Sequence, residues 1–212
     1  MTISEFPPVS DADEDGLLAF GGDLEVESLL LAYRSGIFPW PIDKNVLAWF
    51  SPPQRAVLFI DEFHISHSLK KDARKPAWRY SMNDHFEEVI ELCAKAKNRK
   101  KQRGTWITPQ MITAYKELFQ AGYAFSAECH YNGVLAGGIY GTSIDGNYAG
   151  ESMFYNQDNA SKLALSFLIE QLKSIGVLWI DFQVLNPFTE SLGAREIQRS
   201  EFLKLLTKNR IN

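Results

Sequence analysis

The sequence predicts an α+β protein made of a small N-terminal α/β unit, residues 1–62, and a larger domain, residues 63–212. Its 212 residues are 45% hydrophobic and 13% aromatic, which is enough apolar side chain for a sizeable core and excludes disorder as the main state. In the larger domain, hairpin-like segments are followed by a helix-like segment and one further strand. That order predicts a mixed sheet with flanking helices.

The N-terminal unit is predicted to contain one capped helix and several short strands. Residues 24–35 have a helical apolar pattern between Asp23, a suitable N-cap, and Gly36, a suitable C-terminal stop. The prolines that follow, up to residue 41, exclude a helix or a central strand there. Residues 46–60 have the pattern of short strands interrupted by a proline pair.

The first part of the larger domain is predicted to be mainly helical. A helix over 82–97 would be capped by Asn83 or Asp84, and Thr108 followed by a proline is a typical start of the next helix. A shorter helix and a strand precede them, over 66–73 and 78–82.

The second part is predicted to be mainly β. Two tight turns, Asn132-Gly133 and Asp145-Gly146, separate three strand-like segments, so we expect consecutive antiparallel hairpins. The strands are expected over 123–130, 134–142 and 147–154, followed by a helix over 158–173, a buried strand over 177–183 and a closing helix over 200–206.

The net charge of −4 conceals a strong segregation of charge along the chain. Residues 1–69 carry 3 basic and 11 acidic side chains, whereas residues 70–103 carry 11 basic and 5 acidic ones. Such a basic stretch is either a solvated helix end and loop or a surface that binds a polyanion. The candidate phosphate ligands of this stretch outside the lysine-rich run over 95–103 are Lys70, Lys71, Arg74 and Lys75.

Three polar residues lie in segments that are otherwise apolar. Glu151 follows a turn into a strand and has Met153 and Phe154 beside it. Asp181 and Gln183 alternate with apolar residues, so their side chains should lie on the same face of a buried strand, where they can hydrogen-bond each other or a shared substrate. The three residues form either a satisfied buried network or a catalytic site.

The chain resembles the leucyl/phenylalanyl-tRNA-protein transferase family over about residues 6–206. The resemblance includes these three polar residues, and its other motifs are Phe38-Pro39-Trp40, Trp49-Phe50-Ser51-Pro52, Gly104-Thr105-Trp106-Ile107-Thr108 and Ser191-Leu192-Gly193-Ala194. It implies a cytoplasmic bacterial enzyme that moves leucine or phenylalanine, and less readily methionine, from aminoacyl-tRNA to an N-terminal Arg or Lys of acceptor proteins, marking them for degradation. It also implies that residues 63–212 form a catalytic domain with the fold of the N-acetyltransferase (GNAT) superfamily.

The resemblance also implies roles for the three polar residues. Peptide-bond formation from an aminoacyl ester requires a neutral amine and removal of its proton, but no enzyme nucleophile. Gln183 would accept a hydrogen bond from the attacking amine, and Asp181 would orient or polarise that contact. Glu151 would bind the cationic acceptor or the aminoacyl amine, or would be the base; the sequence leaves these roles open.

The resemblance further implies two binding sites for the aminoacylated end of the tRNA. Trp49 and Trp106 would hold the terminal adenosine, since a base stacks well on an indole ring. An apolar pocket would take the amino-acid side chain; its matching positions are Ile139, Tyr148, Leu165, Leu168 and Ile180. Each of these residues, taken singly, is also a normal core residue.

Several other classes of function lack support in the sequence. The four histidines and the two cysteines, Cys93 and Cys129, have no metal-ligand spacing, so we expect neither a metal site nor a disulfide framework. No apolar run is long enough to span a membrane, and the N-terminus lacks the pattern of a secretory signal. We expect no cofactor, because the segment from 154 to 173 lacks the glycine-rich loop of a coenzyme A-dependent acyltransferase. An RNA-binding module without activity would leave the inward carboxylates unexplained.

Overall fold

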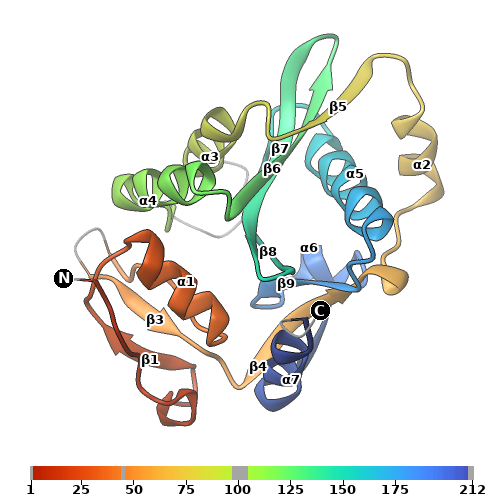
Figure 1. Cartoon of the computed structure of the whole chain (residues 1–212). Helices are drawn as coiled ribbons and strands as arrows, with labels where there is room; N and C mark the ends of the chain where they lie inside the picture. Colours follow the sequence, from red (N-terminus) through yellow and green to blue (C-terminus); the bar gives the residue numbers. More distant parts are fainter. Residues whose placement is uncertain (1, 44–45, 97–104, 210–212) are drawn as a thin grey trace.

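The computed structural model describes residues 2–43, 46–96 and 105–209, which form two β-sheets with helices around them (Figure 1). Most of the basic run over 95–103 lies outside these residues. In the part of the chain that is described, no helix has both the length and the apolar character needed to cross a bilayer.

A three-stranded antiparallel sheet and one helix make up the N-terminal unit. The strands are β1 (Leu17–Phe20), β2 (Phe38–Pro39) and β3 (Ala48–Phe50), in the order β1-β3-β2, and a short 3-10 helix, η1 (Val9–Asp11), precedes them. Helix α1 (Val26–Arg34) buries one side against the rest of the molecule.

The predicted ends of this first helix are half right. Gly36 has a φ of 76°, the left-handed conformation expected of a helix stop. Asp23 is not the N-cap, because the helix starts after Glu25; the Asp23 carboxylate instead accepts hydrogen bonds from the Glu25 N–H and the Ser28 hydroxyl in the preceding turn.

A seven-stranded mixed sheet forms the larger domain, and it contains the two hairpins predicted from the tight turns. Its order is β10-β4-β9-β8-β7-β6-β5, and all neighbours are antiparallel except β8 and β9. The strands are β4 (Gln54–Phe59), β5 (Trp78–Met82), β6 (Ala124–Tyr131), β7 (Val134–Ile144), β8 (Asn147–Tyr155), β9 (Trp179–Gln183) and β10 (Arg195–Gln198). Because β4 belongs to this sheet, the two sheets part between Phe50 and Gln54, earlier than the predicted limit at residue 62.

Helices cover both faces of the large sheet (Figure 1). On the face toward α1 lie α3 (Phe86–Lys95) and α4 (Pro109–Gln120), whereas α2 (His67–Ala73) and α5 (Ala160–Ser174) lie beyond the other face. The remaining helical elements are η2 (Ile60–Glu62), α6 (Pro187–Glu190) and α7 (Arg199–Asn209). Each face of the sheet therefore has its own apolar core. Tyr140 of β7 packs in the core with α1, α3 and α4, and its neighbour Ile139 packs in the core with α5.

The predicted caps of the two helices next to the sheet had different outcomes. Thr108 caps α4 as predicted, because its hydroxyl accepts the Met111 N–H at 3.3 Å. The helix predicted over 82–97 starts only at Phe86, so neither Asn83 nor Asp84 caps it. Glu128 lies fully buried beside this helix end, where it accepts hydrogen bonds from the Ser81 and Ser126 hydroxyls and the His85 N–H.

Candidate active site

Glu151 is the centre of a hydrogen-bonded cluster to which three other elements contribute. Its carboxylate accepts hydrogen bonds from the Tyr33 hydroxyl at 2.8 Å, the Gln183 amide nitrogen at 3.0 Å and the Tyr115 hydroxyl at 3.3 Å. The two tyrosine hydroxyls also contact each other. Since α1, α4 and β9 supply these donors, residues far apart in the sequence meet at one carboxylate.

The cluster favours a proton on Glu151. Burial is the main reason why the pKa of Glu151 rises to about 7; the Tyr33 hydrogen bond opposes this rise, and the charge of Asp181 adds to it. Glu151 can therefore gain or lose a proton near neutral pH.

The two tyrosines differ from Glu151 in their protonation. Burial, followed by the nearby charge of Glu151, raises the pKa values of both Tyr33 and Tyr115 well above the usual 10.0. Both phenols therefore keep their protons at neutral pH and serve Glu151 as hydrogen-bond donors.

Gln183 reaches Glu151 because of a break in the regular strand. Its φ is 56°, in the left-handed region that residues other than glycine rarely adopt, and the register between β4 and β9 shifts next to it, between Ala56 and Val57. The Gln183 backbone N–H donates to the Asp181 carboxylate at 2.8 Å. The predicted link between Asp181 and Gln183 thus runs through the backbone, while the Gln183 side chain turns to β8.

Asp181 is one half of a buried ion pair. Both of its carboxylate oxygens accept hydrogen bonds from the Arg55 guanidinium, at 2.9 and 2.7 Å, and the two side chains are 5% and 2% exposed. Arg55 also donates to the Gly36 carbonyl at 3.1 Å and lies between the rings of Phe38 and Phe202, 4.6 and 4.5 Å from their centroids. The charge of Asp181 is therefore compensated, unlike that of Glu151.

Comparison with known proteins agrees with the resemblance seen in the sequence. Residues 57–207 match the family described as leucyl/phenylalanyl-tRNA protein transferase, and residues 22–53 match the N-terminal domain of the same family. The chain belongs to this family. The limit between the two matches, residues 54–56, falls at the start of β4, close to where the two sheets of the structure part.

Relatives of this transferase cover almost its whole length. The leucyl/phenylalanyl-tRNA–protein transferase of Flavobacterium johnsoniae is 48% identical over 95% of this chain and 94% of its own. That of Colwellia psychrerythraea is 46% identical over 93% of this chain and 84% of its own.

A solved structure with little sequence similarity shares the fold of the transferase. The crystal structure of FemX aligns with 84% of this chain and 70% of its own, with 9% identity and a TM-score of 0.51, which is a likeness of fold alone. A GCN5-related N-acetyltransferase from Kribbella flavida aligns with 78% of this chain and 58% of its own, with 10% identity and a TM-score of 0.42. The expected mixed sheet with flanking helices is confirmed by the strand order and by the parallel pairing of β8 and β9.

The transferase brings a different pair of tryptophans together from the pair expected. The Trp49 ring is 1% exposed, packs edge-on against Phe6, and donates its indole N–H to the Gly21 carbonyl at 2.9 Å. No base can stack on it in this structure. Trp106 instead stacks on Trp40, with ring centroids 5.0 Å apart and planes 17° apart.

The five residues expected to form the aminoacyl pocket lie together on the α5 side of the sheet. Ile139, Leu165, Leu168 and Ile180 are completely buried in one core cluster. Tyr148 packs against this cluster and also borders a space of about 20 Å³ next to Tyr33 and Asp181, which is room for about one water molecule. These five side chains therefore pack against one another and occupy much of the space expected for the pocket.

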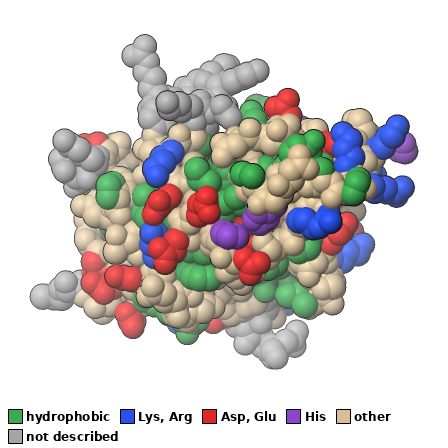
Figure 2. Space-filling model, turned by 90° about the horizontal axis from the view of Figure 1, so that it is seen from above, with side chains coloured by type: hydrophobic (Ala, Val, Ile, Leu, Met, Phe, Trp, Pro, Cys, Tyr) green, Lys and Arg blue, Asp and Glu red, His purple; other side chains and the backbone are tan. Residues whose placement is uncertain are grey.

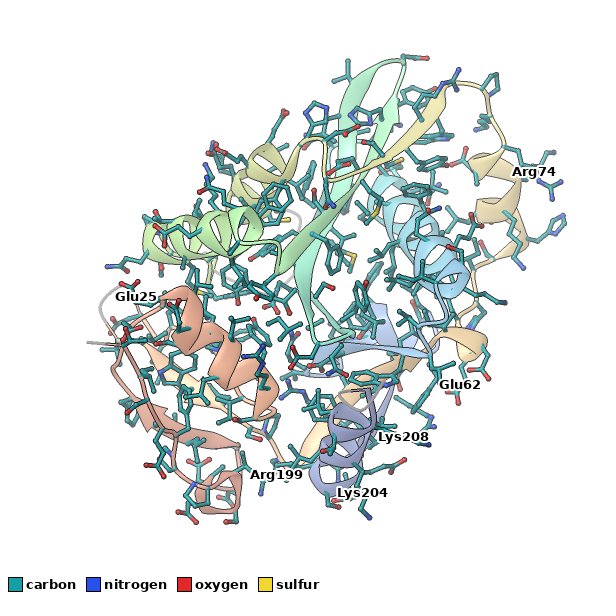
Figure 3. All side chains as sticks on the ribbon, in the orientation of Figure 1. Glu25, Glu62, Arg74, Arg199, Lys204 and Lys208 are labelled. Atoms are coloured by element: carbon teal, nitrogen blue, oxygen red, sulfur yellow. The ribbon has the colours of Figure 1, made fainter. Side chains whose placement is uncertain are left out.

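The four expected phosphate ligands lie on or just after α2. Lys70, Lys71 and Arg74 are exposed, and Lys75 forms an ion pair with Asp72 at 2.6 Å. Figure 2 shows Lys and Arg side chains gathered at this end of the molecule, and in Figure 3 Arg74 points away from the fold.

The buried ion pair predicts a large loss of stability when one charge is removed. Asp181→Asn leaves the Arg55 charge buried without its partner, so the free energy of unfolding in urea should fall by ~3–5 kcal/mol. Combining it with Arg55→Met should restore much of this stability. Glu62→Gln, which removes the partner of the exposed Arg195, is the control and should cost ~0–1 kcal/mol. Equal small losses for Asp181→Asn and Glu62→Gln would contradict the importance of the buried pair.

The raised pKa of Glu151 predicts a pH-dependent contribution to stability. A carboxyl whose pKa rises from 4.5 to about 7 on folding stabilises the protein below pH 4.5, and this contribution is lost as the pH rises through 7. Between pH 5 and pH 8, wild type should therefore lose roughly 3 kcal/mol relative to Glu151→Gln, measured as the free energy of unfolding. Parallel pH profiles for the two proteins would show that Glu151 has an ordinary pKa.

Proposed function

We propose that the protein transfers leucine or phenylalanine, and less readily methionine, from aminoacyl-tRNA to an N-terminal Arg or Lys of acceptor proteins in the cytoplasm, marking them for degradation. Membership of the family supports the reaction class. The observation that carries the proposal is the contact between Gln183 and Glu151, because it combines a hydrogen-bond acceptor for an amine with a carboxylate of pKa about 7.

The proposed chemical step needs only a positioned amine and a place for its proton. The Gln183 side chain donates its amide N–H to Glu151, so its carbonyl oxygen is left to accept a hydrogen bond from the attacking amine. A carbon–nitrogen bond forms as the ester carbon–oxygen bond breaks. Glu151 takes the proton that the amine loses and returns it to the ribose oxygen that leaves, a task for which a pKa near the working pH is best suited.

Glu151 has a second possible role in the same position. As a carboxylate within the Tyr33 and Tyr115 cluster, it can bind the cationic acceptor or the aminoacyl amine instead of removing a proton. Glu151→Gln separates the two roles, because a binding defect is overcome at high acceptor concentration and the loss of a base is not.

Asp181 acts in the proposal as a positioning residue. Its two oxygens are occupied by Arg55, and one of them also accepts the Gln183 N–H, so it does not meet the substrate proton. It holds the strained Gln183 backbone in the conformation that directs the side chain to Glu151. This corresponds to the orienting role that the resemblance implies.

The terminal adenosine of the tRNA is proposed to stack on the pair formed by Trp40 and Trp106. Both rings are partly exposed and already lie parallel, whereas Trp49 is enclosed. Stacking on an aromatic ring contributes ~1–3 kcal/mol per base.

The aminoacyl side chain is proposed to enter the apolar region around Ile139, Tyr148, Leu165, Leu168 and Ile180. Polar atoms without partners are costly in such surroundings, so leucine, phenylalanine and methionine fit and charged side chains do not. Because these side chains now pack together, binding requires some of them to move.

Transfer of radiolabelled leucine from leucyl-tRNA to a protein that begins with Arg tests the proposed function and the role of Gln183. Wild type should transfer leucine, and Gln183→Ala should lower the single-turnover rate ~10²-fold with little change in tRNA binding. Gln157→Ala, an exposed glutamine in the turn after β8, is the control and should retain full activity. If wild type binds charged and uncharged tRNA equally but transfers nothing, the protein is an RNA-binding module. A normal rate for folded Gln183→Ala would remove the glutamine from the mechanism.

The adenosine proposal predicts which tryptophan matters for the donor. Trp40→Ala and Trp106→Ala should each raise the KM for leucyl-tRNA and for the minimal donor leucyl-adenosine by a similar factor, about tenfold. Trp49→Phe keeps the core filled and should leave both KM values nearly unchanged. A rise for leucyl-tRNA alone would place the contact elsewhere on the tRNA.

A further inference from the structure

A cavity of about 560 Å³ lies between α2, the start of α5 and the turn after α6, apart from the Glu151 cluster. Three lysines line it: Lys71 and Lys75 from the α2 region and Lys162 from the first turn of α5. The other polar groups of the lining are His64, Ser66, Ser68, Asp72, Asn159 and Ser191. A volume of this size holds a ligand considerably larger than a single ion.

The charges around this cavity are unevenly balanced. Among the described residues that line it, Asp72 is the only carboxylate. Both oxygens of Asp72 are already in use, one in the ion pair with Lys75 and the other in a hydrogen bond from the Asn159 amide. Across the described part of the chain, Lys71 and Lys162 form no ion pair with a carboxylate. Two positive charges in the cavity are therefore left for an anion.

Lys162 lies where the helix itself does not favour a cation. The first turn of α5 carries the positive end of the helix dipole and contains no acidic residue. The Lys162 ammonium lies 5.9 Å from the centroid of the Phe188 ring, too far for more than a weak contact. A bound anion next to the ammonium would compensate both the side chain and the helix end.

We propose that this cavity binds a phosphate of the nucleic-acid backbone, with Lys71 and Lys162 as its charged ligands. The inference rests on the proposed function, since it assigns the phosphate to the acceptor strand of the aminoacyl-tRNA. Lysines combined with serine hydroxyls suit a tetrahedral phosphate, and the volume admits the sugar next to it. Lys162, which lies outside the basic stretch of the sequence, is the new ligand.

The cavity lies on the opposite side of the large sheet from the Glu151 cluster, since α2 and α5 border the cavity whereas α1 and α4 supply the two tyrosines. From Glu151, β8 runs four residues to Tyr155, about 13 Å at 3.3 Å per residue, and a short turn then leads to α5. The cavity and the Glu151 cluster are thus joined along the chain by β8 and the turn after it, and a tRNA that occupies both has to pass from one side of the sheet to the other.

Equilibrium binding of uncharged tRNA tests the cavity separately from catalysis. Lys162→Gln should weaken binding about tenfold and lower the slope of log affinity against log salt by ~0.7–0.9, whereas Lys162→Arg should keep both close to wild type. Lys173→Gln, at the far end of the same helix, is the matched control and should leave the affinity for tRNA close to that of wild type. Asp72→Asn removes the one negative charge and should tighten binding. Equal effects of Lys162→Gln and Lys173→Gln in folded proteins would overturn the proposal.

Transfer kinetics and a small anion identify the source of the phosphate. Lys162→Gln should raise the KM for leucyl-tRNA and leave both kcat and the KM for leucyl-adenosine, which has no phosphate, unchanged. Pyrophosphate should compete with leucyl-tRNA but not with leucyl-adenosine. If pyrophosphate binds the cavity while Lys162→Gln leaves tRNA binding intact, the cavity serves a free anion and the tRNA assignment is wrong. Absence of leucine transfer by wild type would refute the proposed function, and the tRNA-binding result would still decide the cavity.

Discussion

The buried pair of Arg55 and Asp181 is the interaction on which the rest of the site depends. The guanidinium joins four parts of the chain, because it binds Asp181 on β9 from its own strand β4, donates to the carbonyl of Gly36 after α1, and lies against Phe202 of α7. A charge of this kind is costly to bury unless every donor finds an acceptor. Its partners therefore fix how the N-terminal unit meets the large sheet, and thereby the position from which Tyr33 reaches Glu151.

The second constraint is the left-handed backbone of Gln183. In a regular strand, Gln183 and Asp181 would extend on the same side, and the amide would lie beside the ion pair. The hydrogen bond from the Gln183 N–H to Asp181 offsets the cost of the unusual φ of 56° and lets the side chain reach Glu151 on the next strand. Strain at this one residue is thus maintained by the same carboxylate that neutralises Arg55.

The sequence predicted the features that depend on local patterns. The Asn-Gly and Asp-Gly turns gave the hairpins, and a hydroxyl before a proline gave the cap at Thr108. The sequence did not predict interactions with residues distant along the chain. At the start of α3 the predicted local cap is absent, and the His85 N–H donates instead to Glu128 on β6.

The residues of the candidate site also differ in whether the sequence could predict them. The polar positions Glu151, Asp181 and Gln183 stood out within apolar strands, but nothing local showed that Tyr33 and Tyr115 would meet there. Arg55 did carry a signal, since it is a lone charge in an apolar strand and so required a counter-charge. The choice between Trp40 and Trp49 could not be made from motifs, because it depends on which ring the N-terminal sheet encloses.

The two carboxylates of the site differ in what surrounds them, and that difference supports the roles proposed for them. Asp181 faces a guanidinium that donates a hydrogen bond to each of its oxygens, so its charge is directly paired. Glu151 has only neutral donors, two phenols and an amide, so its charge is poorly compensated and its pKa rises to about 7. A carboxyl that titrates near neutral pH is suited to exchange protons, and a carboxylate held by a guanidinium is suited to hold the structure. Since the negative charge of Asp181 also raises the pKa of Glu151, the residue that positions Gln183 helps to adjust the acid next to it.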